Sequence, residues 1–243
     1  MMHWIFNSQS RVIGAALVLA LVGWSAPGFA QDAKKKANNE ENNWVKVCDK
    51  APVPEKGKDG KVVKAEKEVC ITRYQQIDGN TGINLVTVGL QQVKGQDAPH
   101  LMIMVPLGMV LKAGVGVVVL NADEWKTLLK KEKLDEKKLK QMLLGFEHCI
   151  FEGCTARAQV KPEVVDSLKK GAGMLVMSVD IQGRPASFIV SLKGFTKAMD
   201  GKPIDNKVFA QMRQQAMAQI RERQKQAYQQ YMAKQKNEGG KKK

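Results

Sequence analysis

Two cysteines five positions apart constrain this chain more than any other feature. They lie in the segment 146–156, where apolar, strand-prone residues flank Cys149 and Cys154, and Gly153 stands directly before the second cysteine. A loop this short brings two Cβ atoms to bonding distance, and a glycine at its tip can adopt a positive φ. The segment therefore predicts a β-hairpin closed by a disulfide, which is typical of a protein outside the cytoplasm.

The first 30 residues are typical of an export signal. Arg11 supplies positive charge, residues 12–24 are apolar, and Gly28-Phe29-Ala30 ends in the small residues that signal peptidase accepts. The apolar run is short for a membrane-spanning helix, which needs about 20 residues, so an uncleaved anchor is the less favoured alternative. We expect residues 1–30 to be removed, leaving a periplasmic, secreted or surface-associated protein with no transmembrane segment.

That compartment decides how the cysteines are interpreted. All four lie beyond the signal, and an even number predicts a two-disulfide framework. Three pairings exist, and we favour Cys48–Cys70 with Cys149–Cys154 because each bridge then closes a hairpin. The redox-active alternative would need a Cys-x-x-Cys spacing, and the zinc alternative is weakened because His148 and Cys149 would point to opposite faces of a strand. We expect structural disulfides, with no metal and no cofactor.

Apolar runs separated by Gly and Pro predict a mainly β domain over 44–199, preceded by a disordered polar leader, 31–43. Within the run 174–181, Leu175 and Met177 share one side and Ser178 the other. An exposed, Pro- and Gly-containing loop is expected over 51–67. The expected strands are 44–48, 69–74, 83–93, 101–105, 115–121, the two arms of the cysteine hairpin, 174–181 and 186–192. About eight strands with few helices indicate a β-sandwich.

A lysine-rich insertion interrupts the β pattern over 123–144. Asp123 is the expected helix cap, and further helical turns are expected over 135–144. The insertion is interpreted as a helix that covers a sheet edge, with a partner-binding lid as the alternative. A short helix over 162–168 begins at Pro162 and stops at Gly171.

The end of the chain carries just over half of the net positive charge. The whole chain has a formal charge of +15, and from Thr196 onward 12 basic and 4 acidic side chains give +8. We expect residues 200–243 to form a basic, Gln/Lys-rich helical tail. Anionic lipid, lipopolysaccharide or acidic glycan are the partners that such charge favours, with a merely solvated tail as the alternative. Nucleic acid is disfavoured because no base-stacking aromatic pattern accompanies the lysines. The candidate anion-binding residues are Arg221, Arg223, Lys241, Lys242 and Lys243.

Several short motifs follow one another through the domain. They are Trp44-x-x-x-Cys48, Cys70-x-x-x-x-Gln75, Pro106-Leu107-Gly108 before Gly114-Val115-Gly116, Phe146-x-x-Cys149 with Gly153-Cys154-x-Ala156, and Ser191-Leu192-Lys193-Gly194-Phe195 with Ala198. In this order, behind an export signal, they resemble the invasion-associated locus B family of alphaproteobacteria. The resemblance implies an immunoglobulin-like β-sandwich with short helical insertions. It also implies a periplasmic or surface-exposed protein. Some pathogenic members of that family are linked to host-cell entry, and the family brings no catalytic residues. The insertion over 123–144 and the C-terminal tail are longer in this chain than is expected of the family.

Three functions follow as hypotheses. The first is a non-enzymatic binding protein of the cell envelope whose partner is an unidentified envelope or host protein. The second is a structural envelope protein whose basic tail rests on an anionic membrane or cell-wall polymer. The third is an enzyme, and it is disfavoured because His100 and His148, the histidines beyond the signal, have no nucleophile and orienting carboxylate at a readable spacing.

Overall fold

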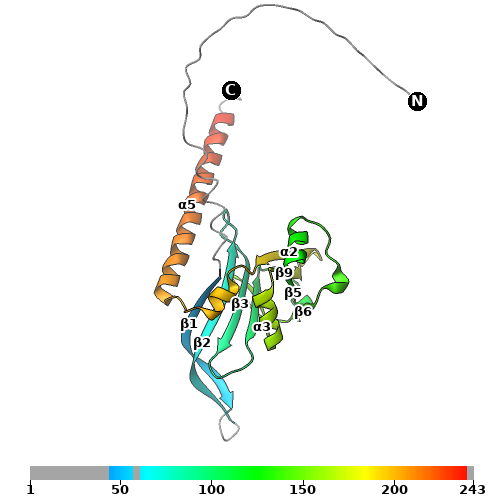
Figure 1. Cartoon of the computed structure of the whole chain (residues 1–243). Helices are drawn as coiled ribbons and strands as arrows, with labels where there is room; N and C mark the ends of the chain where they lie inside the picture. The colour runs from blue at the N-terminus through cyan, green and yellow to red at the C-terminus, as the bar shows by residue number, and fades with distance from the viewer. Residues whose placement is uncertain (1–43, 57–60, 240–243) are drawn as a thin grey trace, which may run out of the picture. The chain divides into compact units, whose positions relative to one another are not determined.

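A computed structural model describes residues 44–56 and 61–239 of the chain (Figure 1). The expected export signal, the leader and Lys241, Lys242 and Lys243 lie outside the described residues. Within the described part, two antiparallel sheets carry most of the regular structure.

The larger sheet has six strands in the order β1-β2-β3-β4-β8-β7. Its first four strands form a meander, and the cysteine hairpin completes it. The strands are β1 (Trp44–Lys56), β2 (Val62–Ile77), β3 (Asn84–Val93), β4 (His100–Val105), β7 (Phe146–Ile150) and β8 (Gly153–Gln159).

The smaller sheet has four strands in the order β10-β9-β5-β6. They are β5 (Val115–Leu120), β6 (Gln141–Leu144), β9 (Gly173–Val179) and β10 (Pro185–Ser191). The hairpin expected near the end of the domain is present as β9 and β10, with Val176 opposite Phe188.

The two sheets share one hydrophobic core. Leu101 and Ile103 of the larger sheet and Val117 and Val176 of the smaller one are fully buried in the same cluster. Strand β4 buries alternate residues, the period-2 pattern of a sheet covered on one face, whereas β5 is buried on both sides. The expected mainly β sandwich with short helices and a C-terminal helix is therefore confirmed.

The prediction of an exposed loop over 51–67 is wrong. β1 and β2 continue as a long antiparallel ribbon in which Pro52 lies opposite Glu66 and Pro54 opposite Lys64. β1 is an edge strand. An edge strand tolerates proline at positions whose amide would face away from the sheet, so the two prolines do not interrupt the ribbon.

The insertion differs from the expected helical pair. Asn121, not Asp123, caps α2 (Ala122–Leu129), and its Oδ1 accepts hydrogen bonds from the backbone amides of Asp123 at 2.9 Å and Glu124 at 3.0 Å. Beyond a short 3₁₀ turn, η3 (Glu136–Lys138), the expected second helix is instead strand β6. Leu144 is buried in the core while Leu143 is exposed, which is a strand alternation.

Strand β9 turns its more polar side inward, contrary to the simplest interpretation of its sequence. Met174, Val176 and Ser178 face the core, and the Ser178 hydroxyl donates to the Gly114 carbonyl at 3.1 Å. Leu175 and Met177 lie on the outer face and are half-buried. The outer face of the smaller sheet is therefore apolar.

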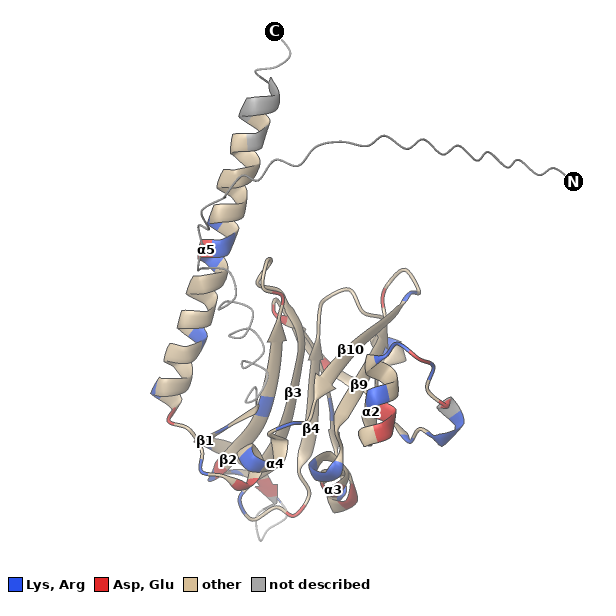
Figure 2. Ribbon diagram, turned by 45° about the horizontal axis from the view of Figure 1, so that its top comes forward, with Lys and Arg blue, Asp and Glu red and all other residues tan. Residues whose placement is uncertain are grey.

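Three further helices complete the described chain. α3 (Pro162–Lys170) begins at a proline, and α4 (Phe195–Asp200) places Phe195 in the core, 4.9 Å from the ring of Trp44. α5 (Asn206–Gly239) packs Ile220 against the turn at Gly82 and Phe209 under the guanidinium of Arg73. In Figure 2 the ribbon is coloured for Lys or Arg on α2, on the loop after it and on α3.

Candidate binding site

The sequence-predicted disulfide residues lie in the larger sheet. Cys48 joins Cys70 across β1 and β2, and Cys149 joins Cys154 across β7 and β8, each with an S–S distance of 2.03 Å. This is the local pairing that the sequence favours. Gly153 has a positive φ, and a Cβ there would overlap the Val105 carbonyl oxygen, so the hairpin tip requires glycine.

Of the predicted anion-binding residues, the structure describes two, Arg221 and Arg223, and these two do not form one site. Arg221 and Arg223 are exposed on α5, and residues two positions apart on a helix point in different directions. Arg223 lies over the turn at Gly79, with its Nη1 3.3 Å from the position of a Cβ at that glycine.

The two histidines lie on the larger sheet with different surroundings. Burial, followed by the charge of Arg157, holds the pKa of His100 below its ordinary value of 6.5, so its imidazole is neutral at pH 7. His148 is half-exposed and its Nδ1 lies 4.0 Å from a carboxylate oxygen of Glu147. Across residues 44–56 and 61–239, no three His, Cys, Asp or Glu side chains meet in a group able to hold a metal ion.

A candidate site lies where the lysine-rich insertion meets the smaller sheet. Trp125 of α2 fastens the insertion, because its indole ring lies directly on Gly173 of β9, where any Cβ would overlap it. Glycine at this position therefore permits a close approach that no larger residue allows. The insertion is held against the outer face of β9 and β5 by this contact.

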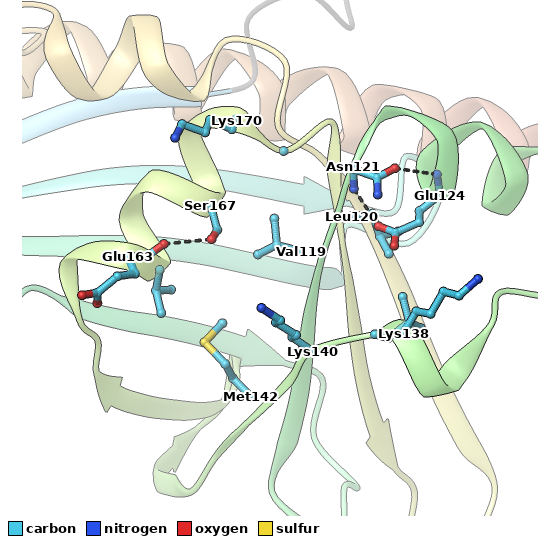
Figure 3. A pocket seen from close by; sticks show the side chains of 13 residues that line it. Val119, Leu120, Asn121, Glu124, Lys138, Lys140, Met142, Glu163, Ser167 and Lys170 are labelled. Carbon is cyan, nitrogen blue, oxygen red and sulfur yellow. Dashed lines mark hydrogen bonds between the residues drawn. The ribbon is translucent and has the colours of Figure 1, made fainter.

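A first hollow of about 520 Å³ opens between β5, the start of β6 and helix α3 (Figure 3). Val119 and Leu120 come from β5, Met142 from β6, Val164 from α3, and Leu139 from the residues after η3. Its volume lies within the range of about 300–1,000 Å³ found for small-molecule sites. The walls are mainly aliphatic, so the hollow suits an apolar group.

Lysines supply the polar part of this hollow. Lys140 points in among the lining residues, whereas Lys138 and Lys170 point away from its centre (Figure 3). Lys138 pairs with Asp135 at 3.2 Å, and among the described side chains no carboxylate lies within ion-pair distance of Lys140.

Two other polar side chains at the rim have partners. The Glu124 carboxylate accepts a hydrogen bond from the Asn121 backbone amide at 2.8 Å, and the Ser167 hydroxyl donates to the Glu163 backbone carbonyl at 2.8 Å. The Glu163 carboxylate points away from the hollow (Figure 3). The ammonium group of Lys140 is therefore a side-chain donor that points into the hollow and remains for a ligand.

A second hollow of about 560 Å³ lies under the insertion on the outer face of the sheet. Val118, Leu175 and Met177 form its sheet side, and Leu128 and Leu134 of the insertion also line it. Leu139 lines this hollow as well as the first, so the two share that side chain as a wall.

Sequence reasoning missed these lining residues. Leu175 and Met177 were placed on the side opposite Ser178 with no site attached, and the segment that contains Leu139 and Lys140 was expected to be helical. The available signal was the excess of apolar residues: both sides of β5 and β9 carry Val, Leu or Met, which indicates that both faces are covered.

The family model described as invasion associated locus B (IalB) protein matches residues 44–130 and 131–203. Two invasion protein B homologs of Brucella abortus, from strain 2308 and from biovar 1 strain 9-941, are each 27% identical over 132 residues. The match covers 54% of this chain and 66%, just under two thirds, of each relative.

A crystal structure of invasion associated protein b from Bartonella henselae matches with a TM-score of 0.45 and 16% identity, covering 66% of this chain and 91% of that one. No helix in the described ranges is long and apolar enough to cross a membrane. The family model spans more than half of the chain, and the matched residues include the cysteine, glycine and core-strand motifs. The chain therefore belongs to the invasion associated locus B (IalB) family.

Proposed function

We propose that this protein is an exported, non-enzymatic binding protein of the cell envelope, and that the first hollow holds its ligand. The observation that carries the proposal is the ammonium group of Lys140 directed into an aliphatic hollow of about 520 Å³. Lys140 is exposed and has no ionic partner among the described side chains, so its ammonium group is available to an anionic ligand at the hollow.

Two further features support the proposal. The two disulfides are typical of a compartment outside the cytoplasm, where the export signal would deliver the chain. The polar residues at the rim of the hollow hydrogen-bond to backbone and cap helices, which are binding and structural roles rather than those of a nucleophile with its base. The insertion then acts as the lid over a ligand.

Native mass spectrometry of the mature protein tests this function. The protein is incubated with an extract of the bacterial envelope, separated by size exclusion and sprayed under non-denaturing conditions. We expect a non-covalent adduct on the wild type that is lost when Val164→Trp fills the first hollow. No adduct on the wild type contradicts a binding role, and conversion of the retained compound to a new mass during incubation would indicate an enzyme.

The basic tail supports a second candidate function, contact with an anionic membrane or cell-wall polymer. Arg221 and Arg223 are exposed on α5, and Tyr228 and Tyr231 beyond them are 64% and 58% exposed. Cationic and amphipathic side chains in this combination favour an interfacial surface. Binding to vesicles rich in phosphatidylglycerol distinguishes this role from the first, because it needs the tail and not the hollow.

A further inference from the structure

The two hollows and Leu139, the side chain they share, specify the kind of anion. We propose that the hollows together form one site for a single-chain amphipathic carboxylate, such as a medium- or long-chain fatty acid. Its carboxylate binds Lys140, and its hydrocarbon chain passes Leu139 into the second hollow. This inference rests on the proposed function and adds the class of ligand to it.

The lining of the second hollow supports a hydrocarbon chain. Val118, Leu128 and Leu134 come from different elements and converge with Leu175 and Met177 around about 560 Å³. Its charged and polar residues are Glu132, Lys133 and Gln141, and the Gln141 amide already packs over Gly116. An apolar space of this kind, which shares the Leu139 side chain with a lysine-containing hollow, fits one long apolar group better than a compact polar ligand.

The position of the charge supports a terminal anion on that chain. Lys140 precedes β6 by one residue and follows Leu139 directly, so the ammonium group lies beside the wall shared by the hollows. Lys170 stands at the rim of the first hollow on α3, and no described acidic side chain pairs with it. A carboxylate bound in the first hollow therefore meets positive charge, whereas the chain behind it meets aliphatic side chains.

The insertion also covers part of the second hollow on its outer side. Trp125 holds α2 on Gly173, and Leu128, one helical turn further on, reaches the second hollow. Beyond the insertion the same sheet face stays open, with Ile189 44% exposed and Leu143 69% exposed. The lid therefore covers the part of the apolar face nearest to the lysines.

Fluorescence titration of the mature protein with cis-parinaric acid, followed by displacement with laurate or dodecanol, tests the proposal. We expect laurate to displace the probe more strongly than dodecanol, and shortening the acid to decanoate and octanoate to weaken binding by up to about fourfold per methylene. Lys140→Gln should weaken laurate binding about tenfold while leaving dodecanol unchanged. Lys130→Gln, a matched change on an exposed lysine outside both hollows, should alter neither.

Two blocking variants test whether one ligand spans both hollows. Val164→Trp narrows only the first hollow and Leu175→Trp only the second, and each should reduce laurate binding by more than tenfold. Ile189→Trp, on the same outer face but lining neither hollow, is the control and should bind as wild type. Circular dichroism of every variant checks that the fold is retained.

The outcomes separate this inference from the proposed function. Equal laurate affinities of Lys140→Gln and Lys130→Gln, or of Leu175→Trp and Ile189→Trp, would overturn the fatty-acid site. An envelope adduct by native mass spectrometry together with no laurate binding would retain the binding function and reject this ligand class. Binding of laurate that depends on Ile189 rather than Leu175 would place the chain on the open sheet face and would also overturn the inference.

Discussion

Substitution of Gly173 by alanine tests whether Trp125 fastens the insertion to the smaller sheet. A Cβ at this position would overlap two carbons of the indole ring and lie 2.7 Å from its Cδ2, whereas ordinary contact begins at 3.4 Å. Either the ring or strand β9 must move, and overpacking of this kind costs about 1–3 kcal/mol of the free energy of unfolding. We therefore expect Gly173→Ala to destabilise the protein by that amount in urea denaturation followed by circular dichroism.

A double-mutant cycle shows whether the indole ring is the cause. In a Trp125→Ala background the new Cβ enters vacated space, and because alanine restricts the unfolded chain, Gly173→Ala should then stabilise by about 0.4–1 kcal/mol. The expected coupling free energy is at least about 1.5 kcal/mol, within the usual range for residues in contact. Gly145→Ala is the control, since a Cβ at Gly145 meets nothing within 4 Å. Equal costs of Gly173→Ala in both backgrounds would refute the idea that Trp125 anchors α2 there.

Four further results are expected. Phe195→Ala should lower the free energy of unfolding by about 3–5 kcal/mol because Phe195 is 1% exposed. Phe151→Ala, at a residue that is 88% exposed, should change it by no more than about 0.5 kcal/mol. Similar losses for the two substitutions would show that α4 does not pack in the core. Peptide mapping without reduction should find Cys48 with Cys70 and Cys149 with Cys154, and a Cys48–Cys149 peptide would contradict the strand pairing. The backbone amide of Arg184 is the largest of the causes that hold the pKa of Asp180 below its ordinary value of 3.8. The carboxylate therefore contributes stability above pH 3.8, and this contribution is lost as the pH falls through the lower pKa of the folded state. Asp180→Asn should flatten the decline of the melting temperature below pH 3.8, and an unchanged decline in the mutant would contradict this. Neutralising Arg221, Arg223, Lys241, Lys242 and Lys243 should weaken binding to anionic vesicles by about 1 kcal/mol per charge at low salt, and neutralising Lys130, Lys131, Lys137 and Lys138 should not; equal losses would mean that only net charge matters.

Much of the fold was predictable because local patterns and tertiary packing agree. The cysteine hairpin, the helix that starts at Pro162 and the hairpin of β9 and β10 each combine a hydrophobic period with a turn or cap residue. The ribbon of β1 and β2 was not predictable from local pattern, because proline and charge usually indicate a loop. Its position at a sheet edge, which decides whether proline is tolerated there, is a property of the whole sheet.

The segment that became β6 shows a different limit. Leu139, Met142 and Leu143 recur at helical spacing, and only the position of β5 decides between helix and strand. Leu144 lies opposite Val115, so pairing with β5 places Leu144 and Met142 toward the core and Leu143 outside. The free energy gained by burying these side chains on an existing sheet exceeds the small free-energy differences of intrinsic helix propensity. The start of β6 in turn places Lys140 at the first hollow and Leu139 at both hollows.

Strand β9 determines where a ligand can bind, and its orientation follows from what each face has to cover. The inner side needs residues that fit between the sheets, and Met174 and Val176 are fully buried there, with Ser178 admitted because the Gly114 carbonyl accepts its hydrogen bond. Leu175 and Met177 are consequently directed outward, where an unshielded apolar face would favour association with other chains. The lysine-rich insertion covers part of this face without filling it, since a space of about 560 Å³ remains beneath Leu128 and Leu134. An apolar face that is shielded but incompletely packed is poorly suited to a purely structural role, because empty space forgoes contacts that a packed interface would make. A reversible apolar occupant would restore those contacts, and for this reason we propose the insertion as a lid over a ligand rather than a cover for a sheet edge.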